Sequence, residues 1–477
     1  MKSPIATVLA LVLFGCGGRD ESSEHRPVNA GINILLLTVD TLRADHMSCY
    51  GYRRRTTPAI DALAARGVAF DRVFTYWPKT RASFAAMFTS LYASQNGLTV
   101  RDRDLPDFNH TLAETLQEGG YRTAAAVDNG NLDRELGFAQ GFDRYEEVWV
   151  SDAETEVERT ELLTRFAIDF LKGYGSPAPF FLWIHYVNPH APYQPPEDLL
   201  RRFRGDGLIP RGAKLEPVVG FHGGVNRHLA LPREAHVGDY IDRYDAEIAL
   251  ADREIGRVLE ALKESRYRSS TMVAFTADHG ESLGEHDYFF DHGYDLFQPS
   301  LHVPLILSFP GVLPAGERVS TSVSTLDLFP TLLDLAQVSF PPGIQGSSLL
   351  PLIRGSTDPL HDRIVFENDH HQLGMTNGRL KLIAVPEEAG NKVRYHLYDL
   401  ARDPGETADL YPSSGARIEP FVAELERFRT RTIAWQQDTA RLRKGEPPRT
   451  DGELSEETLR NLEALGYLGK GTKGEKR

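Results

Sequence analysis

Five apolar runs of strand length alternate with amphipathic helical stretches between residue 31 and roughly residue 350. Runs that are apolar throughout are typical of strands buried on both faces of a parallel sheet. Their alternation with helices predicts an α/β fold, in which a mostly parallel sheet is flanked by helices. The predicted strands are Asn33–Val39, Thr123–Val127, Phe180–Tyr186, Thr271–Thr276 and Val303–Ser308, and the predicted helices are Pro58–Arg66, Thr111–Gly119, Glu158–Tyr174, Asp242–Ser265 and Leu326–Ala336.

The pattern changes beyond residue 360, where short apolar runs replace the alternation. We predict a main, catalytic domain over residues 31–355 and a small C-terminal α+β subdomain with an antiparallel sheet over residues 356–440. Residues 197–237 lack a clear period, which indicates a long surface insertion able to contact a substrate. Residues 441–477 are expected to form a terminal helix and a charged disordered tail. The short predicted strands are Arg363–Glu367, Leu380–Ile383 and Arg394–Leu400, and the terminal helix is Ser455–Leu465.

The charge and the cysteine content limit the class of protein. The 477 residues carry a formal net charge of −14, which argues against a nucleic-acid partner because no broad basic surface is expected. An acidic protein can still bind an anionic substrate where a metal ion and nearby cations reverse the local field. Cys16 and Cys49 are the only cysteines, so a disulfide framework and a cysteine-built zinc site are both excluded.

The N-terminal residues have the features of an export signal. The apolar stretch from Ile5 to Phe14 is too short to span a bilayer but suits a signal peptide. Leu13-Phe14-Gly15-Cys16 is similar to a bacterial lipobox, which predicts a signal peptide over residues 1–16, lipidation of Cys16 and a polar tether over residues 17–30. The predicted location is the bacterial cell envelope, with the protein exported and lipid-anchored at the periplasmic face or the outer membrane. Phe14 is bulkier than a lipobox usually carries, so processing elsewhere stays open, as does a soluble protein with a frayed apolar start.

Two predicted strands end at side chains that bind metals. Asp40 follows the strand Asn33–Val39, and Asp278-His279 closely follows the strand Thr271–Thr276. Open α/β sheets place their ligands at the carboxyl ends of the strands. Two carboxylates and an imidazole at this edge could share one divalent cation. Either fragment alone favours a simple capping role, whereas both together with the hydroxyl described next favour a metal site.

A hydroxyl at the start of a predicted helix is the candidate nucleophile. The segment from Lys79 to Tyr92 contains Thr80 and Ser83 near its beginning. The N-terminal end of a helix stabilises a nearby anion and favours a lowered hydroxyl pKa. Coordination to a cation would activate the hydroxyl further. The alternative is that Thr80 or Ser83 is the N-cap of an ordinary helix.

The order of these fragments along the chain resembles the sulfatase family within the alkaline-phosphatase-like superfamily. The resemblance covers roughly residues 31–410 and implies the α/β fold, the metal ion and the ester chemistry of that family. It rests on Asp40 after an apolar strand, Thr80-Arg81-Ala82-Ser83 with Phe88-Thr89, Pro189-His190-Ala191-Pro192-Tyr193, Asp278-His279-Gly280-Glu281, Val303-Pro304-Leu305-Ile306 with Pro310-Gly311, Asp327-Leu328-Phe329-Pro330-Thr331, and Leu397-Tyr398-Asp399-Leu400 with Asp403-Pro404.

The chain departs from sulfatases that use formylglycine. The fixed positions of their Cys/Ser-x-Pro-x-Arg motif fall on Thr80, Ala82 and Phe84, so the convertible residue, the proline and the arginine are all missing. The first strand of those sulfatases ends in paired aspartates, whereas this chain has Asp40-Thr41. The pattern instead resembles a threonine-nucleophile variant, a group that includes phosphodiesterases and phosphoglycerol or phosphoethanolamine transferases.

The resemblance also implies residue roles. One divalent ion, which could be Mn, Zn, Ca or Mg, is expected to bind Thr80 together with the two strand ends. His190 and His292 are the candidates for contacting ester oxygens and protonating the leaving group, because imidazole titrates near neutral pH. The expected metal ligands are Asp40, Thr80, Asp278 and His279, the catalytic residues are Thr80, His190 and His292, and the weaker substrate-binding candidates are Lys79, Arg81 and His185.

We therefore predict a metal-dependent hydrolase of sulfate or phosphate esters that acts through a covalent Thr80 intermediate. Its partner would be a sulfated or phosphorylated small molecule, glycan or lipid. One alternative is a phosphodiesterase or a phosphoglycerol- or phosphoethanolamine-type phosphotransferase acting on envelope glycans or lipids. Another is a catalytically degenerate lipoprotein that binds anionic glycans without turnover.

Overall fold

The computed structural model describes residues 31–98, 104–231, 235–387, 392–443 and 454–468. The predicted signal peptide, Cys16, the polar tether and the predicted tail from Gly469 to Arg477 lie outside these residues. Within them the chain folds around a nine-stranded sheet of order β14-β2-β13-β10-β1-β5-β3-β4, with β15 paired to β2. Its strands are β1 (Asn33–Val39), β2 (Val68–Phe74), β3 (Arg122–Val127), β4 (Arg144–Glu147), β5 (Phe180–Tyr186), β10 (Thr271–Ala277), β13 (His302–Ser308), β14 (Glu317–Val319) and β15 (Val323–Ser324).

The centre of the sheet aligns the strand ends that carry the candidate ligands. β1 lies between β10 and β5 and runs parallel to both. Val39 pairs with Ala277 on one side and with Tyr186 on the other. All residues of the three strands are buried, as the uniform apolar runs predict. Asp40 directly follows β1 and Asp278 directly follows β10, so this register places both at the same edge of the sheet.

The sheet is mostly parallel, as predicted, with β13 antiparallel to both β10 and β2. The five predicted strands match β1, β3, β5, β10 and β13 to within one residue at each end. The short β4, β14 and β15 were not predicted. Nor was β2, because Asp71 and Arg72 interrupt its apolar run at positions that are half-buried and exposed.

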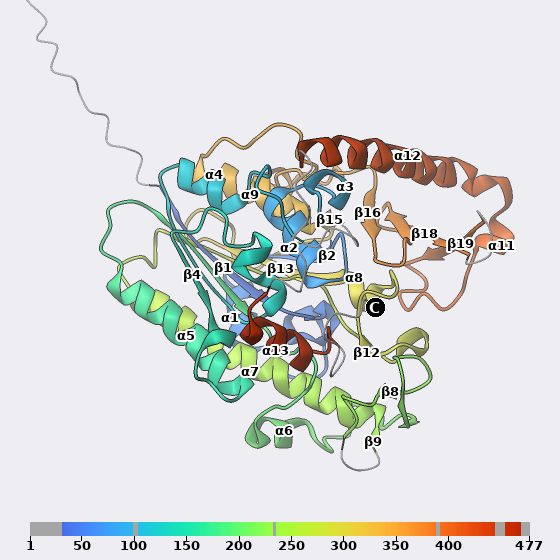
Figure 1. Cartoon of the computed structure of the whole chain (residues 1–477), viewed down its shortest axis with the longest axis horizontal. Coiled ribbons are helices and arrows are strands. Elements are labelled where there is room, and N and C mark those ends of the chain that lie inside the picture. The colour runs from blue at the N-terminus through green and yellow to red at the C-terminus, as the bar shows by residue number, and fades with distance from the viewer. Residues whose placement is uncertain (1–30, 99–103, 232–234, 388–391, 444–453, 469–477) are drawn as a thin grey trace, which may run out of the picture.

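Helices cover both faces of the sheet, as predicted (Figure 1). On one side lie α1 (Pro58–Ala64), α5 (Glu156–Gly173) and the long α7 (Val237–Glu264), and on the other lie α2 (Thr80–Thr89), α4 (Leu112–Glu118) and α9 (Leu328–Ala336). α4 and α5 each begin with a capping box, in which the N-cap threonine and a glutamate three residues later satisfy free backbone amides. The other short helices of the main domain are α3 (Ala93–Asn96), α8 (Gln298–Leu301) and α10 (Leu350–Ile353).

The insertion over residues 197–237 has more structure than a loop. It begins with α6 (Glu197–Phe203), whose buried Leu199, Leu200 and Phe203 form an apolar cluster with residues of α7. The rest contains pairs of two-residue strands, which the sequence does not predict because no period spans so few residues. These strands are β6 (Lys214–Leu215), β7 (Pro217–Val218), β8 (Val225–Asn226) and β9 (Ala235–His236), while β11 (Ser282–Leu283) and β12 (Phe289–Asp291) pair nearby.

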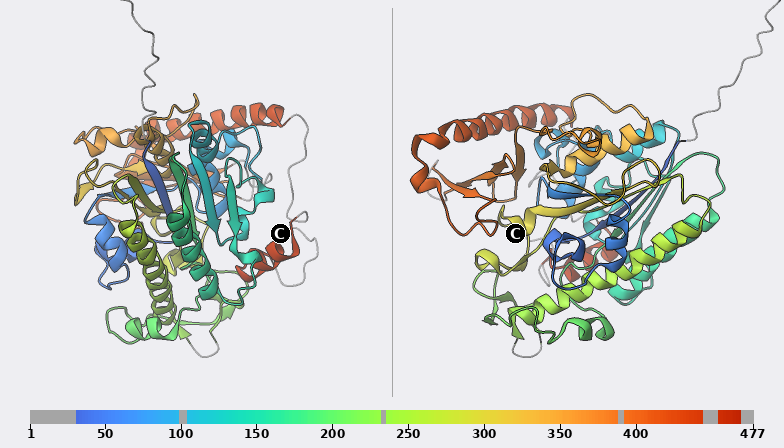
Figure 2. Two further views of the ribbon diagram at one scale, coloured as in Figure 1. Left: turned by 90° about the vertical axis from the view of Figure 1, so that its left-hand side faces the viewer. Right: turned by 180° about the vertical axis from the view of Figure 1, so that it is seen from behind.

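The C-terminal subdomain consists of a four-stranded antiparallel sheet and a long helix (Figure 2). The antiparallel strands were predicted, apart from β17, but the helix α12 (Glu419–Leu442) was not. α12 packs Phe421, Leu425 and Phe428 against the apolar face of this sheet. The subdomain contains β16 (Ile364–Glu367), β17 (Leu373–Thr376), β18 (Leu380–Pro386), β19 (Val393–Asp399), the short α11 (Tyr411–Ser414) and α12.

The last helix, α13 (Glu456–Ala464), does not belong to that subdomain. It packs on the main domain, next to the single turns η3 (Gly130–Leu132) and η5 (Val148–Val150). Figures 1 and 2 show it in dark red, well separated from α12. Within the ranges described above, no helix combines the length and apolarity that crossing a membrane requires.

Candidate active site

The two strand ends meet and form a cluster of potential metal ligands. One ligand atom from each of Asp40, Asp278 and His279 can be chosen so that all three lie within 4.8 Å of one another. All three side chains are fully buried. His279 Nε2 lies 3.7 Å from Asp40 Oδ1 and 3.4 Å from Asp278 Oδ2.

The unsatisfied atoms of this cluster fit a cation. Asp40 Oδ1 and Asp278 Oδ2 are buried without a hydrogen-bond partner, which is costly unless a cation or another group binds them. His279 Nδ1 lies 2.9 Å from the Gly280 carbonyl, an acceptor, so Nδ1 carries the proton and Nε2 presents its lone pair. Two carboxylate oxygens and one imidazole nitrogen therefore face a common centre, and this donor set suits a divalent ion.

The two carboxyl groups have opposite pKa shifts. Burial opposes ionisation of Asp40, but the imidazoles of His185, His190 and His279 close to it lower its pKa to about 2. Burial and the charge of Asp40 raise the pKa of Asp278 well above its usual range. A cation between them would remove this repulsion and favour the ionised form of both.

Backbone groups hold the second carboxylate in place. Asp278 Oδ1 accepts hydrogen bonds from the amides of Thr41 and His279, at 3.2 and 2.9 Å. Thr41 has a φ of 52°, in the left-handed region that β-branched residues rarely adopt. The Tyr244 hydroxyl donates to the Thr41 carbonyl at 2.7 Å and helps to fix this turn. Such strain at a ligand-bearing turn is typical of a functional site.

Two further residues support Asp40 from behind. Asn129 Nδ2 donates to Asp40 Oδ2 at 2.6 Å, and His185 Nε2 lies 3.5 Å from the same oxygen. His185 is fully buried, and its Nδ1 is 3.0 Å from Thr38 Oγ1. The sequence analysis singled out His185 as a substrate contact, and the structure places it beside Asp40, where it orients a carboxylate. The sequence analysis did not identify Asn129, which reaches Asp40 only through this tertiary contact.

Thr80 is the first residue of α2, and its hydroxyl faces the cluster. Thr80 Oγ1 lies 3.4 Å from His279 Nε2, and the residue is 1% exposed. The first amides of a helix have no partner within the helix, so this end favours an anion. Ser83, the alternative hydroxyl, donates instead to the Asp278 carbonyl at 2.7 Å. Thr80 is thus the hydroxyl that is placed for chemistry, whereas Ser83 ties α2 to the strand end.

His190 and His292 lie together on the open side of Thr80. Their ring centroids are 5.2 Å apart, and both side chains are buried. His190 Nδ1 lies 2.6 Å from the Ala191 carbonyl, and His292 Nδ1 lies 2.9 Å from Glu281 Oε1. Burial lowers the pKa of both rings, and the neighbouring His279 and His190 lower that of His292 further. Each neutral ring therefore directs its Nε2 toward the same space.

A tyrosine that the sequence analysis missed fills that space. The Tyr467 hydroxyl lies 3.0 Å from His190 Nε2, 3.3 Å from His292 Nε2 and 3.3 Å from Thr80 Oγ1. Tyr467 follows α13, nearly 400 residues after Thr80 in the chain. Local sequence gives no signal for it, because a tyrosine after a helix is usually part of an apolar contact.

The basic candidates near Thr80 are placed differently from one another. Lys79 forms an ion pair with Asp369 at 2.5 Å. Its side chain also lies so close to Gly293, the neighbour of His292, that a Cβ added to this glycine would meet Lys79 Cε at 2.4 Å. Arg81 is half-buried in the first turn of α2. The position of the formylglycine arginine holds Phe84, whose ring packs 4.9 Å from that of His185.

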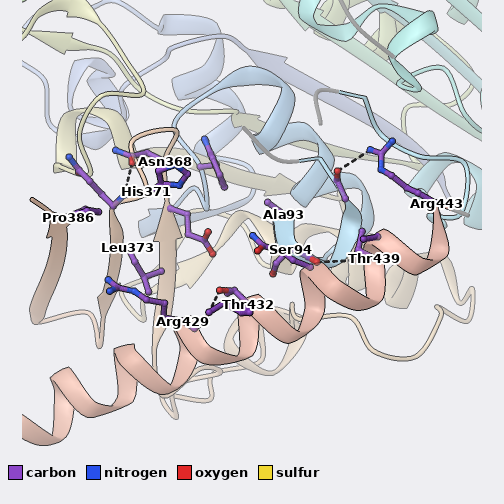
Figure 3. Close-up of a pocket in the computed structure, with 17 residues that line it drawn as sticks. Ala93, Ser94, Asn368, His371, Leu373, Pro386, Arg429, Thr432, Thr439 and Arg443 are labelled. Carbon is purple, nitrogen blue, oxygen red and sulfur yellow. Dashed lines mark hydrogen bonds between the residues drawn. The ribbon is translucent and has the colours of Figure 1, made fainter. Parts of the chain in front are cut away.

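Cavities open on the histidine side of the site. One of about 280 Å³ is lined by His292, Lys79 and aromatic side chains that include Tyr288 and Tyr294. A second of about 40 Å³ is lined by His190, His292 and Tyr467. A separate cavity of about 550 Å³ lies between α12, α3 and the strands of the subdomain (Figure 3). It contains none of the ligand cluster, so we place the chemistry at the smaller cavities.

Comparison with known proteins agrees with this architecture. The Sulfatase family profile matches residues 32–338, and the profile of the N-sulphoglucosamine sulphohydrolase C-terminal region matches residues 284–429. The N-acetylglucosamine-6-O-sulfatase of Bacteroides thetaiotaomicron is 26% identical over 74% of this chain and 76% of its own length. The arylsulfatase of Clostridium perfringens is 27% identical over 80% of this chain and 90% of its own length.

Solved structures share the fold. A protein in complex with its substrate D-glucosamine-2-N,6-O-disulfate aligns with a TM-score of 0.70 and 22% identity, over 86% of this chain and 98% of that one. The phosphonate monoester hydrolase of Agrobacterium radiobacter aligns with a TM-score of 0.68 and 22% identity, over 86% of this chain and 96% of its own. The α/β fold with a mostly parallel sheet, the C-terminal subdomain and the family are thus as predicted. With the family profile covering most of the main domain, the chain belongs to the sulfatase family of sulfuric-ester hydrolases.

Proposed function

We propose that this protein hydrolyses sulfate or phosphate esters with one divalent cation and with Thr80 as the nucleophile. The observation that carries the proposal is the buried convergence of Thr80 Oγ1 with the unpartnered oxygens of Asp40 and Asp278 and the lone pair of His279. The sulfatase names of the relatives support a sulfate ester. The absence of the formylglycine motif leaves a phosphate ester as the other substrate class.

The residues divide the reaction between two sides of the site. Asp40, Asp278 and His279 would hold the cation, which supplies charge to stabilise the developing anion and to lower the pKa of a hydroxyl. Thr80 Oγ gives up its proton to solvent and attacks the sulfur or phosphorus, the bond to the leaving ester oxygen breaks, and a covalent Thr80 ester forms. His190 or His292, in its protonated form, gives a proton to the departing oxygen. Water then gives a proton to that neutral imidazole and attacks the Thr80 ester. The bond to Thr80 Oγ breaks, Thr80 takes up a proton, and sulfate or phosphate leaves.

Activity assays on matched esters would identify the substrate class. The purified protein is depleted of metal, reconstituted with Mn, Zn, Ca or Mg, and assayed on an aryl sulfate, an aryl phosphate monoester and an aryl phosphate diester. We expect turnover that depends on the added ion and is lost in Thr80→Ala while bound metal is retained. Thr80→Ser, which keeps a hydroxyl, is the matched control and should retain part of the activity. Equal activity of Thr80→Ala and the unmodified protein would refute the assignment of Thr80 as the nucleophile.

We also propose that the protein is exported and held in the cell envelope by lipidation of Cys16. The support is the N-terminal sequence, where a short apolar stretch precedes a lipobox-like cysteine. Expression in a bacterial host with a labelled fatty acid should give a labelled protein in the membrane fraction. Cys16→Ser should be unlabelled, and labelling that persists in it would contradict the assignment.

A further inference from the structure

Tyr467 has the geometry of a working part of the site. Its hydroxyl contacts the candidate nucleophile and both candidate proton donors, at 3.0–3.3 Å. These are the groups that an ester must contact in order to react. A residue in this position either takes part in the reaction or only covers the site, and the attachment of Tyr467 distinguishes the two.

The backbone of Tyr467 is fixed to helix α13. The amide of Tyr467 donates to the Leu462 carbonyl at 2.9 Å, and the amide of Gly466 donates to the Glu463 carbonyl at 3.1 Å. This pair of bonds is a Schellman motif, which ends a helix with one residue in the left-handed region. Gly466 has a φ of 86°, and an added Cβ would meet His228 Nε2 at 2.7 Å. The turn therefore requires glycine, and its two hydrogen bonds fix the backbone of Tyr467 relative to the helix.

Helix α13 is fixed in turn by buried polar contacts. Thr458 Oγ1 donates to Asp133 Oδ2 at 2.6 Å and accepts from Trp149 Nε1 at 3.1 Å. Asn461 Oδ1 accepts from the Gly130 amide at 2.8 Å, and Leu462 is fully buried. A buried polar group left without its partner is unfavourable, so these bonds specify one docked position. Such anchoring is unlike that of a loosely held cover.

The neutral site also needs the hydrogen bond that Tyr467 can give. With Nδ1 of His190 bonded to the Ala191 carbonyl, this ring in its neutral form presents Nε2 as an acceptor. Acceptors do not stabilise the negatively charged oxygens of a sulfate or phosphate ester. The phenol O–H of Tyr467 is a hydrogen-bond donor, and it lies within 3.0–3.3 Å of the candidate nucleophile and both histidines.

We propose that Tyr467 is a catalytic residue of the proposed ester hydrolase, and that its hydroxyl donates a hydrogen bond to an oxygen of the transferring sulfuryl or phosphoryl group. Without a substrate, the hydroxyl proton of Tyr467 has three neighbours, Thr80, His190 and His292. When an ester binds, the Tyr467 O–H bond can rotate from His190 to an ester oxygen while the helix stays docked. The inference rests on the proposed function, and it assigns to α13 the task of carrying this donor into the site.

The test compares Tyr467→Phe with the unmodified full-length protein. The change removes one oxygen atom and keeps the ring. We expect kcat on the preferred ester to fall by about 10²-fold, as for the loss of one donor to a developing oxyanion, and the affinity for inorganic sulfate or phosphate to fall by a few-fold. Metal content and melting temperature should be unchanged. Tyr395→Phe, which removes a hydroxyl bonded to Glu426 in the distant subdomain, is the matched control.

The possible results separate this inference from the proposed function. Activity of Tyr467→Phe that equals or exceeds that of the unmodified protein would overturn the inference, because the tyrosine would then merely cover the site. If Thr80→Ala is also fully active, the proposed function itself fails. Calorimetric titration with sulfate and phosphate gives a readout that is independent of turnover. Unchanged anion affinity in Tyr467→Phe, together with unchanged kcat, would leave Tyr467 without a role.

Discussion

The two halves of this active site are built in different ways. The ligand cluster stands on the ends of β1 and β10, two adjacent parallel strands whose every residue is buried. The opposite side depends on α13, a short helix held by three hydrogen bonds at its docking surface and by the two that form its final turn. The first half offers buried acceptors and the second offers a donor. Sheet register thus provides the metal-binding geometry, and a docked helix provides part of the contact with the substrate.

The largest effect should come from the nucleophile, where the two halves meet. Thr80→Ala removes the oxygen that forms the covalent ester, and we expect kcat to fall by about 10⁴-fold with the metal still bound. Stopped-flow and steady-state assays measure the loss, and metal analysis shows that the cluster is intact. A loss of metal in the same proportion would mean that Thr80 serves the cluster rather than the reaction.

A change within the cluster should remove both metal and activity. Asp278→Asn takes away the charge of a buried oxygen that has no hydrogen-bond partner. We expect metal affinity and turnover to fall together by about 10³-fold, because ligand charge dominates the binding of a hard cation. Titration of the metal-free protein with each ion gives the affinity. Asp291→Asn, which changes a half-buried carboxyl outside the three-ligand cluster, is the control and should keep its metal.

His190, which contacts Tyr467, should control the dependence of activity on pH. Burial lowers its pKa below 6.5, so the protonated ring that can donate to the leaving oxygen is lost as pH rises through that lower value. We expect kcat/KM to decline over this range, and His190→Gln to be about 10²-fold slower at the optimum and to lack this limb. The full pH profile of both proteins is the measurement. If the same decline of kcat/KM with pH persists in His190→Gln, the proton donor would be His292 instead.

The smallest effect should come from the docking surface of α13. Thr458→Val removes the hydroxyl that joins Asp133 to Trp149, and weaker docking should lower kcat by roughly fivefold. If the helix acts through Tyr467, the same change should have no further effect in a Tyr467→Phe background. Thr430→Val, at an exposed position of α12, is the control. If the effects of Thr458→Val and Tyr467→Phe on kcat were fully additive, the helix would not act through the tyrosine.

The sequence predicted the half of the site that depends on strands. Uniformly apolar runs identify buried strands, and the side chain that follows each run has only one sheet edge to occupy, so Asp40 and Asp278-His279 could be paired without a structure. The predicted helix start left Thr80 and Ser83 as candidates, and the resemblance to the sulfatase family selected Thr80. The fold class was likewise predictable, because strand and helix periods alternate over more than half of the chain.

The other half could not be read from the sequence, for physical reasons. Asn129 and Tyr467 reach the site through tertiary contacts to Asp40 and to the two histidines, and no period or spacing encodes such contacts. β2 carries two polar residues in its apolar run, and α12 has an apolar face that becomes evident only once the small sheet is present. Tertiary packing overrides local preference at these places.

The position of Tyr467 in the chain also affects how the enzyme matures. During synthesis Asp40 and Thr80 emerge from the ribosome early, and the strands that align the ligands can pair before α13 exists. A chain interrupted after Ser324 but before residue 467 would contain every strand of the main sheet and the three ligands, yet it would lack the phenol between His190 and His292. On the proposed role of this tyrosine, full reactivity is reached only when synthesis of the C-terminal helix is finished.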